Sequence, residues 1–132
     1  MATETRVAIS QSGDVVTARQ QGRALAARLG FSSTDQTLIA TAISEMARNI
    51  LLYAKTGEIV LRPEQNGKRG ITVIAHDAGP GIPDMARALQ NGYSTSGSLG
   101  VGLPGTKRIM DEFELVSEVG KGTTVTMRKW KQ

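Results

Sequence analysis

The sequence predicts an α+β fold: a two-layer α/β sandwich in which helices cover one face of a mixed, mostly antiparallel sheet. Two observations lead to this class. Long amphipathic segments with apolar residues at helical spacing alternate with short runs rich in Ile and Val. After the first strand, the short runs come as adjacent pairs joined by turns that contain Gly, which is typical of hairpins. The order strand, two helices, hairpin, irregular loop, helix, hairpin favours helices packed on one side of the sheet.

Size and composition indicate one globular domain, residues 1–132. With 132 residues, of which 39% are hydrophobic and only 4% aromatic, the chain can bury one core built from aliphatic side chains and Met. No apolar run approaches the roughly 20 residues that cross a bilayer, and the first residues lack the layout of a secretory signal. The chain has no Cys, which excludes disulfides and thiolate metal sites. We therefore expect a cytoplasmic protein without a membrane partner.

The net charge of +4 raises the question of a nucleic-acid partner. Basic residues, however, occur as scattered pairs with almost no aromatic side chains among them, so no surface for stacking bases is expected. These pairs are Lys68-Arg69, Lys107-Arg108 and Arg128-Lys129. We predict no nucleic-acid binding, and an acidic protein partner or ATP itself fits the charge equally well.

Three elements are expected in the first half of the chain. Residues 5–10 have the pattern of a short strand. A helix from Ser12 ends at Gly30, since glycine readily takes the left-handed conformation of a helix cap. Ser33 and Gln36 have the spacing of a capping box, which predicts a second helix from Ser33 to about residue 56. Its apolar residues at helical spacing are Leu38, Ile39, Ala42, Ile43, Met46, Ile50 and Tyr53.

The second half predicts two hairpins separated by an irregular loop and a helix. In order, these are strands 58–62 and 71–77, the loop 78–98 with one helical turn at 84–90, the helix 99–111, and strands 114–119 and 123–129. The turns of the two hairpins are marked by Asn66-Gly67 and by Gly120-Lys121-Gly122.

Glu45 and Asn49 are the first candidates for chemistry. They stand four residues apart on the second helix, so they share one face, and their neighbours place them at the edge of the apolar stripe. An amide oxygen and a carboxylate there could divide the work, with Asn49 as a ligand for Mg²⁺ and Glu45 as a base. The alternative is an ordinary solvated helix face.

Asp77 ends a strand and opens a loop of alternating Gly and Pro. A carboxylate in this position can accept a hydrogen bond from an amino group. Gly79 and Gly81 would let a flat ring approach the backbone closely. The alternative is a simple turn in which the aspartate bonds to its own backbone.

The glycine-rich segment around residue 100 is the third cluster. Its G-x-G-x-x-G spacing lacks the preceding strand of a dinucleotide site, and its Gly-Thr-Lys ending transposes the Gly-Lys-Thr of a P-loop. Backbone N–H groups at the start of a helix nevertheless attract phosphate, so residues 100–103 are candidates to bind it. The alternative is a flexible loop with a helix cap. With a closing Gly120-Lys121-Gly122-Thr123 turn, the three clusters together indicate a nucleotide site.

These same clusters resemble the motifs of the GHKL superfamily, which includes gyrase, Hsp90, histidine kinases and MutL. Residues 43–49 look like its N box, and Asp77-Ala78-Gly79-Pro80-Gly81 looks like its first glycine box. Residues 100–103 and Gly122-Thr123 look like the second and third glycine boxes. The likeness covers nearly the entire chain in the right order. Within the superfamily, the small single-domain form is most similar to bacterial anti-sigma kinases and serine/threonine switch kinases.

The resemblance implies a Bergerat ATP-binding fold with ATP and Mg²⁺ as cofactors. By it, Asp77 would hold the adenine amino group, Asn49 would ligate the magnesium, and Glu45 would be the catalytic residue that orients or deprotonates the acceptor hydroxyl. The nucleotide-binding residues would be Asn49, Asp77, Gly79, Gly81, Gly100, Val101, Gly102, Leu103 and Thr123. Some relatives carry an arginine where this chain has Ser98, so Arg48 and Lys107 are candidates to neutralise the γ-phosphate.

The resemblance also implies partners. A switch kinase of this kind phosphorylates STAS-domain proteins (RsbS/RsbR-like) on Ser or Thr in stress signalling. It would also bind and activate a PP2C-type phosphatase regulator (RsbU-like). Two alternatives stay open: an anti-sigma factor kinase that sequesters a sigma factor, and an ATP-binding interaction module with negligible kinase activity.

Overall fold

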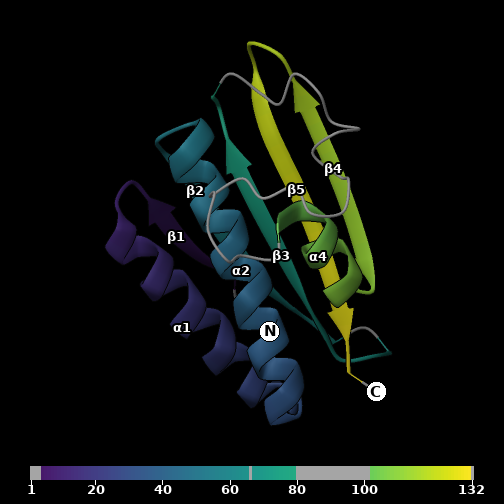
Figure 1. The fold of residues 1–132 in the computed structure, drawn as a ribbon. Coiled ribbons are helices and arrows are strands. Elements are labelled where there is room, and N and C mark those ends of the chain that lie inside the picture. The colour runs from purple at the N-terminus through teal and green to yellow at the C-terminus, as the bar shows by residue number, and fades with distance from the viewer. Residues whose placement is uncertain (1–3, 66, 80–101, 132) are drawn as a thin grey trace.

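The computed structural model describes residues 4–65, 67–79 and 102–131. In these ranges the chain builds one five-stranded sheet with the strand order β1-β2-β3-β5-β4 (Figure 1). The strands are β1 Thr5–Ile9, β2 Gly57–Glu64, β3 Gly70–Asp77, β4 Glu112–Glu118 and β5 Gly122–Trp130. Each neighbouring pair is antiparallel, so the sheet that was expected to be mixed is wholly antiparallel in this part of the chain.

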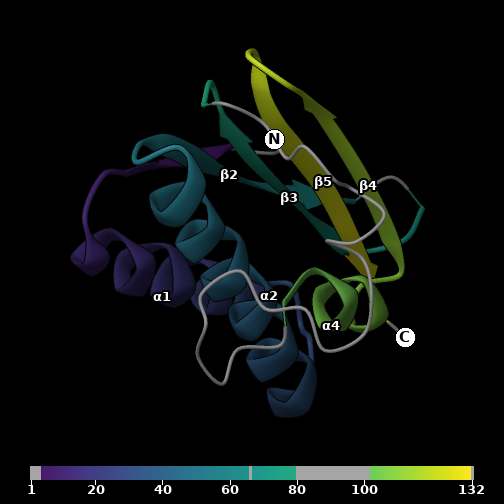
Figure 2. The ribbon, with the colours of Figure 1, turned by 45° about the horizontal axis from the view of Figure 1, so that its top comes forward.

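The helices lie on one face of this sheet, as Figure 2 shows. They are α1 Ser12–Arg28, α2 Ser33–Tyr53 and α4 Gly102–Ile109. Helices on one side and strands on the other make two layers, which confirms the predicted class. Among the helices of the described ranges, none is both long and apolar enough to span a bilayer.

The junction of α1 and α2 follows the expected logic with one correction. Gly30 has a φ of 91°, the left-handed conformation predicted for the end of the first helix. The N-cap of α2, however, is Ser32 rather than Ser33, because the Ser32 hydroxyl accepts a hydrogen bond from the Asp35 N–H at 3.1 Å. The amide of Gln36 donates instead to the carbonyl of Phe31 at 2.9 Å, so it also secures the start of α2.

The core fills the space between the layers. The inward faces of the strands contribute residues such as Ile59, Val73 and Met127, and α2 contributes Ile43 and Met46, all nearly inaccessible to solvent. Gly22 allows helix α1 to approach α2 closely. A residue with a Cβ at this position would overlap the Ile43 side chain. Besides α1, helix α2 also contacts β2, β3 and α4.

Candidate functional site

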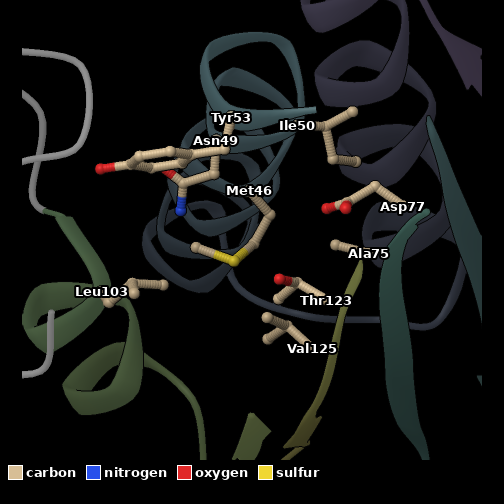
Figure 3. A pocket seen from close by; sticks show the side chains of 9 residues that line it. All are labelled: Met46, Asn49, Ile50, Tyr53, Ala75, Asp77, Leu103, Thr123 and Val125. Atoms are coloured by element: carbon tan, nitrogen blue, oxygen red, sulfur yellow. The ribbon is translucent and has the colours of Figure 1, made fainter. Parts of the chain in front are cut away.

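A hollow lies where the C-terminal half of α2 faces the ends of β3 and β5 and the start of α4 (Figure 3). It holds about 340 Å³ of empty space when the open solvent at its mouth is counted. Its described lining residues are Met46, Asn49, Ile50, Tyr53, Ala75, Asp77, Leu103, Thr123 and Val125. Elements distant in the sequence therefore meet around one mostly apolar space with a few polar groups.

Asp77 is the last residue of β3, and its carboxylate is turned into this hollow (Figure 3). The side chain is only 9% exposed. Its Oδ1 accepts a hydrogen bond from the Gly79 N–H at 2.9 Å, which is the turn bond considered above as an alternative. This bond holds the carboxylate in place while the group borders the hollow, so the turn and an acceptor role for Asp77 are compatible.

Three glycines let the chain pack tightly around Asp77. A Cβ on Gly57 would lie 2.6 Å from the His76 carbonyl oxygen, and one on Gly79 would lie 2.8 Å from the Ala54 Cα. A Cβ on Gly122 would overlap the carbonyl oxygen of Asp77 itself, and Gly122 also has a φ of 125°. The sequence motifs singled out Gly79 and the turn Gly120-Lys121-Gly122-Thr123, which contains Gly122. They missed Gly57, whose contact with β3 depends on the pairing of β2 with β3.

Thr123 lies directly opposite Asp77 in the pairing of β3 with β5. On its other side it pairs with Ser117 of β4, and the two hydroxyl oxygens are 2.9 Å apart. No sequence motif marks Ser117, because only the register of β4 against β5 brings it to this site. The β5 end of the hollow therefore carries a hydroxyl held by a second hydroxyl.

Asn49 lines the hollow, and Glu45 lies one helical turn before it on α2. Glu45 was expected at the edge of the apolar stripe, but it is 1% exposed and lies within the core layer. A solvated helix face is therefore wrong for Glu45. Arg48 covers it from outside, with Nη1 3.5 Å from Glu45 Oε2 and a side chain that is 42% exposed. Glu45 is not among the described residues that line the hollow.

The start of α4 contributes the last predicted group. Gly102 is the first residue of the helix, and the buried Leu103 side chain lines the hollow. Lys107, in the last turn of α4, is exposed. The predicted residues Gly81, Gly100 and Val101, the helical turn at 84–90 and Ser98 lie outside the described residues.

Comparisons with known proteins show to which family this chain is similar. Residues 10–129 match the family described as histidine kinase-like ATPase domain. The chain is 51% identical to the serine/threonine-protein kinase RsbT of Bacillus subtilis (strain 168), over 98% of each chain. It is 33% identical to the anti-sigma F factor of Thermoanaerobacter sp. (strain X514), over 92% of this chain and 89% of that one.

A solved structure shows the same fold at low identity. The structure of the RsbU and RsbW domains of Rv1364c from Mycobacterium tuberculosis superposes with a TM-score of 0.69 at 19% identity. It covers 100% of this chain, which spans about a third (33%) of the length of that one.

Proposed function

This chain belongs to the histidine kinase-like ATPase domain family, and we propose that it is a serine/threonine protein kinase. It transfers phosphate from ATP to partner proteins. The phosphate then regulates which other proteins those partners bind. The observation that carries the proposal is the hollow shared by Asn49, Asp77 and Thr123. Three motifs far apart in the sequence supply three different polar groups to one apolar space, which suits a base and its phosphates. The 51% identity to a serine/threonine kinase over 98% of the chain supports the same conclusion.

Recognition of the nucleotide is assigned to residues at two ends of the hollow. The carboxylate of Asp77 accepts a hydrogen bond from the adenine amino group, and Thr123 supports the same end of the base. Asn49 offers an amide oxygen to Mg²⁺, which takes few protein ligands and completes its shell with phosphates and water. The backbone N–H groups at the start of α4, with Gly100 and Val101 before it, bind the phosphates.

In phosphoryl transfer, this chain positions the reactants and moves one proton. ATP supplies the phosphoryl group, and Mg²⁺ offsets the phosphate charge when both are bound. Glu45 orients the acceptor hydroxyl and takes its proton as the hydroxyl oxygen bonds to the γ-phosphorus and the bond from that phosphorus to ADP breaks, so that ADP leaves. Arg48 is the better placed of the two candidate cations for the γ-phosphate, because its guanidinium already lies beside Glu45.

The partners proposed are STAS-domain proteins as substrates and a PP2C-type phosphatase regulator that is activated by contact. This assignment rests on the family resemblance and on the identity to RsbT. A cytoplasmic location, which fits the cysteine-free sequence, is part of the same proposal. The second candidate is an anti-sigma factor kinase, which the 33% identity to an anti-sigma F factor supports.

The test is a transfer assay with γ-labelled ATP, Mg²⁺ and STAS-domain proteins from the source cell, each offered separately. We expect label on a Ser or Thr of the STAS protein that survives acid treatment. Label that is lost in acid, or label retained on this chain, would contradict the proposed acceptor chemistry. A partner that binds in an ATP-dependent way but gains no label would indicate an interaction module, and capture of a sigma factor would favour the second candidate.

A further inference from the structure

Lys129 of β5 ties the end of helix α4 to the sheet. Its ammonium group donates a hydrogen bond to the carbonyl oxygen of Ile109, the last residue of α4, at 2.9 Å. A lysine side chain has donors and no acceptor, so the direction of this bond is fixed. Lys129 is half-buried and leaves β5 on the same face as Thr123 and Met127, because alternate residues of a strand share a face. The bond therefore joins the inner face of the sheet to the helical layer.

The opposite end of α4 borders the hollow. Gly102 begins the helix, and the fully enclosed Leu103 side chain lines the hollow. A single rigid helix of 8 residues thus runs from the hollow to the carbonyl that Lys129 binds. The backbone N–H groups of a first helical turn point outward along the helix axis, so their aim depends on the direction of that axis.

The direction of α4 depends on how the helix is held along its length. Among the described helices and strands, α2 is its main neighbour (Figure 1). The chain also joins β5 at Asp111, whose backbone N–H donates to the Arg128 carbonyl oxygen at 2.9 Å, but Asp111 lies two residues beyond the helix. The bond from Lys129 acts on the helix itself, at the end remote from the hollow. Losing it would let that end shift against β5 and tilt the other end.

We propose that Lys129 is a positioning residue for the phosphates of the nucleotide. By holding the end of α4 against β5, it aims the backbone N–H groups at the start of α4 into the hollow. The inference rests on the proposed function, because it assumes that the phosphates bind at the start of α4. Lys129 does not contact the nucleotide; its ammonium group lies at the negative end of the helix dipole, where a cation is favoured. It acts on the phosphates only through the helix.

The test compares the affinities for ATP and for adenosine, which carries the base but no phosphates. Both are measured with Mg²⁺ by NMR titration, which also reports whether each variant is folded. In Lys129→Met, which removes the donor but keeps an unbranched side chain, the ratio of ATP to adenosine affinity should fall about 3- to 10-fold, the usual contribution of a helix start to binding an anion. Lys129→Arg keeps a donating cation and should retain the ratio.

Lys131→Met is the matched control. It removes the same charge two residues further along the chain, from an exposed side chain that makes no hydrogen bond or ion pair with other residues of the described ranges. The ratio should stay unchanged in this variant. An equal fall in Lys131→Met and Lys129→Met would mean that only the loss of a positive charge matters, which would overturn the inference.

A purely structural role for Lys129 would weaken ATP and adenosine together or affect neither, and an unchanged ratio in folded Lys129→Met would overturn the inference. Should Lys129→Met fail to fold, Lys129→Gln, whose shorter side chain cannot make the same bond, takes its place with the same expected fall. Asp77→Asn separates this result from a failure of the proposed function.

If Asp77→Asn weakens both ligands but the ratio in Lys129→Met is unchanged, only the inference fails. If Asp77→Asn leaves ATP binding intact, or if the unmodified chain binds neither ligand, the nucleotide site itself is wrong and the inference falls with it.

Discussion

Asp77 and Thr123 lie directly opposite each other in the antiparallel pairing of β3 and β5, although helix α4 and strand β4 come between them in the sequence. The carboxylate and the hydroxyl both border the hollow that Asn49 and Leu103 close from the helical layer. The sheet thus supplies the groups assigned to the base, and the helices supply those assigned to the metal and the phosphates. This division lets each assignment be tested by a separate substitution.

Asn49→Ala tests the metal assignment. Removing the amide oxygen should weaken binding of Mg-ATP far more than binding of ATP without metal, since only the former uses a ligand from this side chain. The measurement is a pair of calorimetric titrations, with magnesium and with a chelator, on the same preparation. An equal loss in both would show that Asn49 only supports the helix, and the metal would need another ligand.

Glu45→Gln tests the proton acceptor. Glutamine keeps the shape of the side chain and one oxygen acceptor while it removes the charge. ATP binding and capture of the STAS-domain partner should persist, but phosphate transfer should fall about 10²–10⁴-fold, the usual contribution of a positioned base. Activation of the phosphatase partner should survive, because it requires a surface and no proton transfer.

A time course of transfer beside a phosphatase assay gives both readouts for Glu45→Gln. Normal transfer would mean that the buried carboxylate serves only the fold. Loss of both outputs, in a variant that still binds ATP, would mean that kinase activity and activation depend on one conformation of the site.

Gly122→Ala tests the packing around Asp77, with Gly120→Ala as a matched control. Both glycines have left-handed φ values, 84° at Gly120 and 125° at Gly122, but only at Gly122 would a Cβ overlap the Asp77 backbone. Gly120→Ala should cost about 1 kcal/mol of unfolding free energy, and Gly122→Ala about 1–3 kcal/mol more. Urea denaturation followed by the fluorescence of Trp130, the single tryptophan, measures both. Equal costs would show that Gly122 is needed for its conformation alone.

Asp14→Ala tests the start of α1 and has a predictable dependence on pH. The backbone N–H of Ser10 donates to the Asp14 carboxylate at 2.9 Å, as does that of Gln11 at 3.1 Å, and these bonds hold the pKa of Asp14 below its ordinary value. A lowered pKa in the folded state means that the ionised carboxylate stabilises the fold above its unfolded pKa of about 3.9. This contribution is lost as the pH falls through the folded pKa.

The unmodified chain should therefore be more stable than Asp14→Ala at pH 7, and the difference should shrink below about pH 4. Denaturation curves at pH 7 and pH 3 measure this difference in unfolding free energy. A difference of the same size at both values would mean that Asp14 contributes through packing or helix propensity instead.

Much of this fold could be predicted from local patterns. The periodicity of α2, the glycine cap after α1 and the two hairpins are properties of short segments, and they appear where expected. Boundaries were less predictable. Strand β2 runs through Pro63 to Glu64, two residues beyond the prediction. Among the described residues its pairing with β1 ends at Leu61, and its pairing with β3 continues through Pro63 to Glu64.

Motifs singled out Asn49 and Asp77, and the structure places both at one hollow, while their assigned roles stay predictions. The surroundings of those residues were not predictable, because they depend on how elements pair in space. Spacing places Glu45 on the same helical face as Asn49, but only the packed structure shows that its carboxylate is enclosed. Ser117 has no motif and reaches the site through the register of two strands.

The most direct test of the central claim is Asp77→Asn, measured for ATP affinity and for phosphate transfer to the STAS-domain partner. Asparagine can still accept the Gly79 N–H bond that forms the turn, so the fold should persist. ATP should bind about 10- to 150-fold more weakly, because a charge-assisted bond to the amino group is lost, and transfer at limiting ATP should fall in parallel.

Asp111→Asn is the matched control, since Asp111 Oδ2 also accepts a backbone N–H, that of Trp130 at 2.7 Å, and does not line the hollow. It should leave both quantities unchanged. We expect ATP binding and transfer to fall in Asp77→Asn alone. A folded Asp77→Asn protein with normal ATP affinity and normal transfer would contradict the assignment of Asp77 to the adenine base.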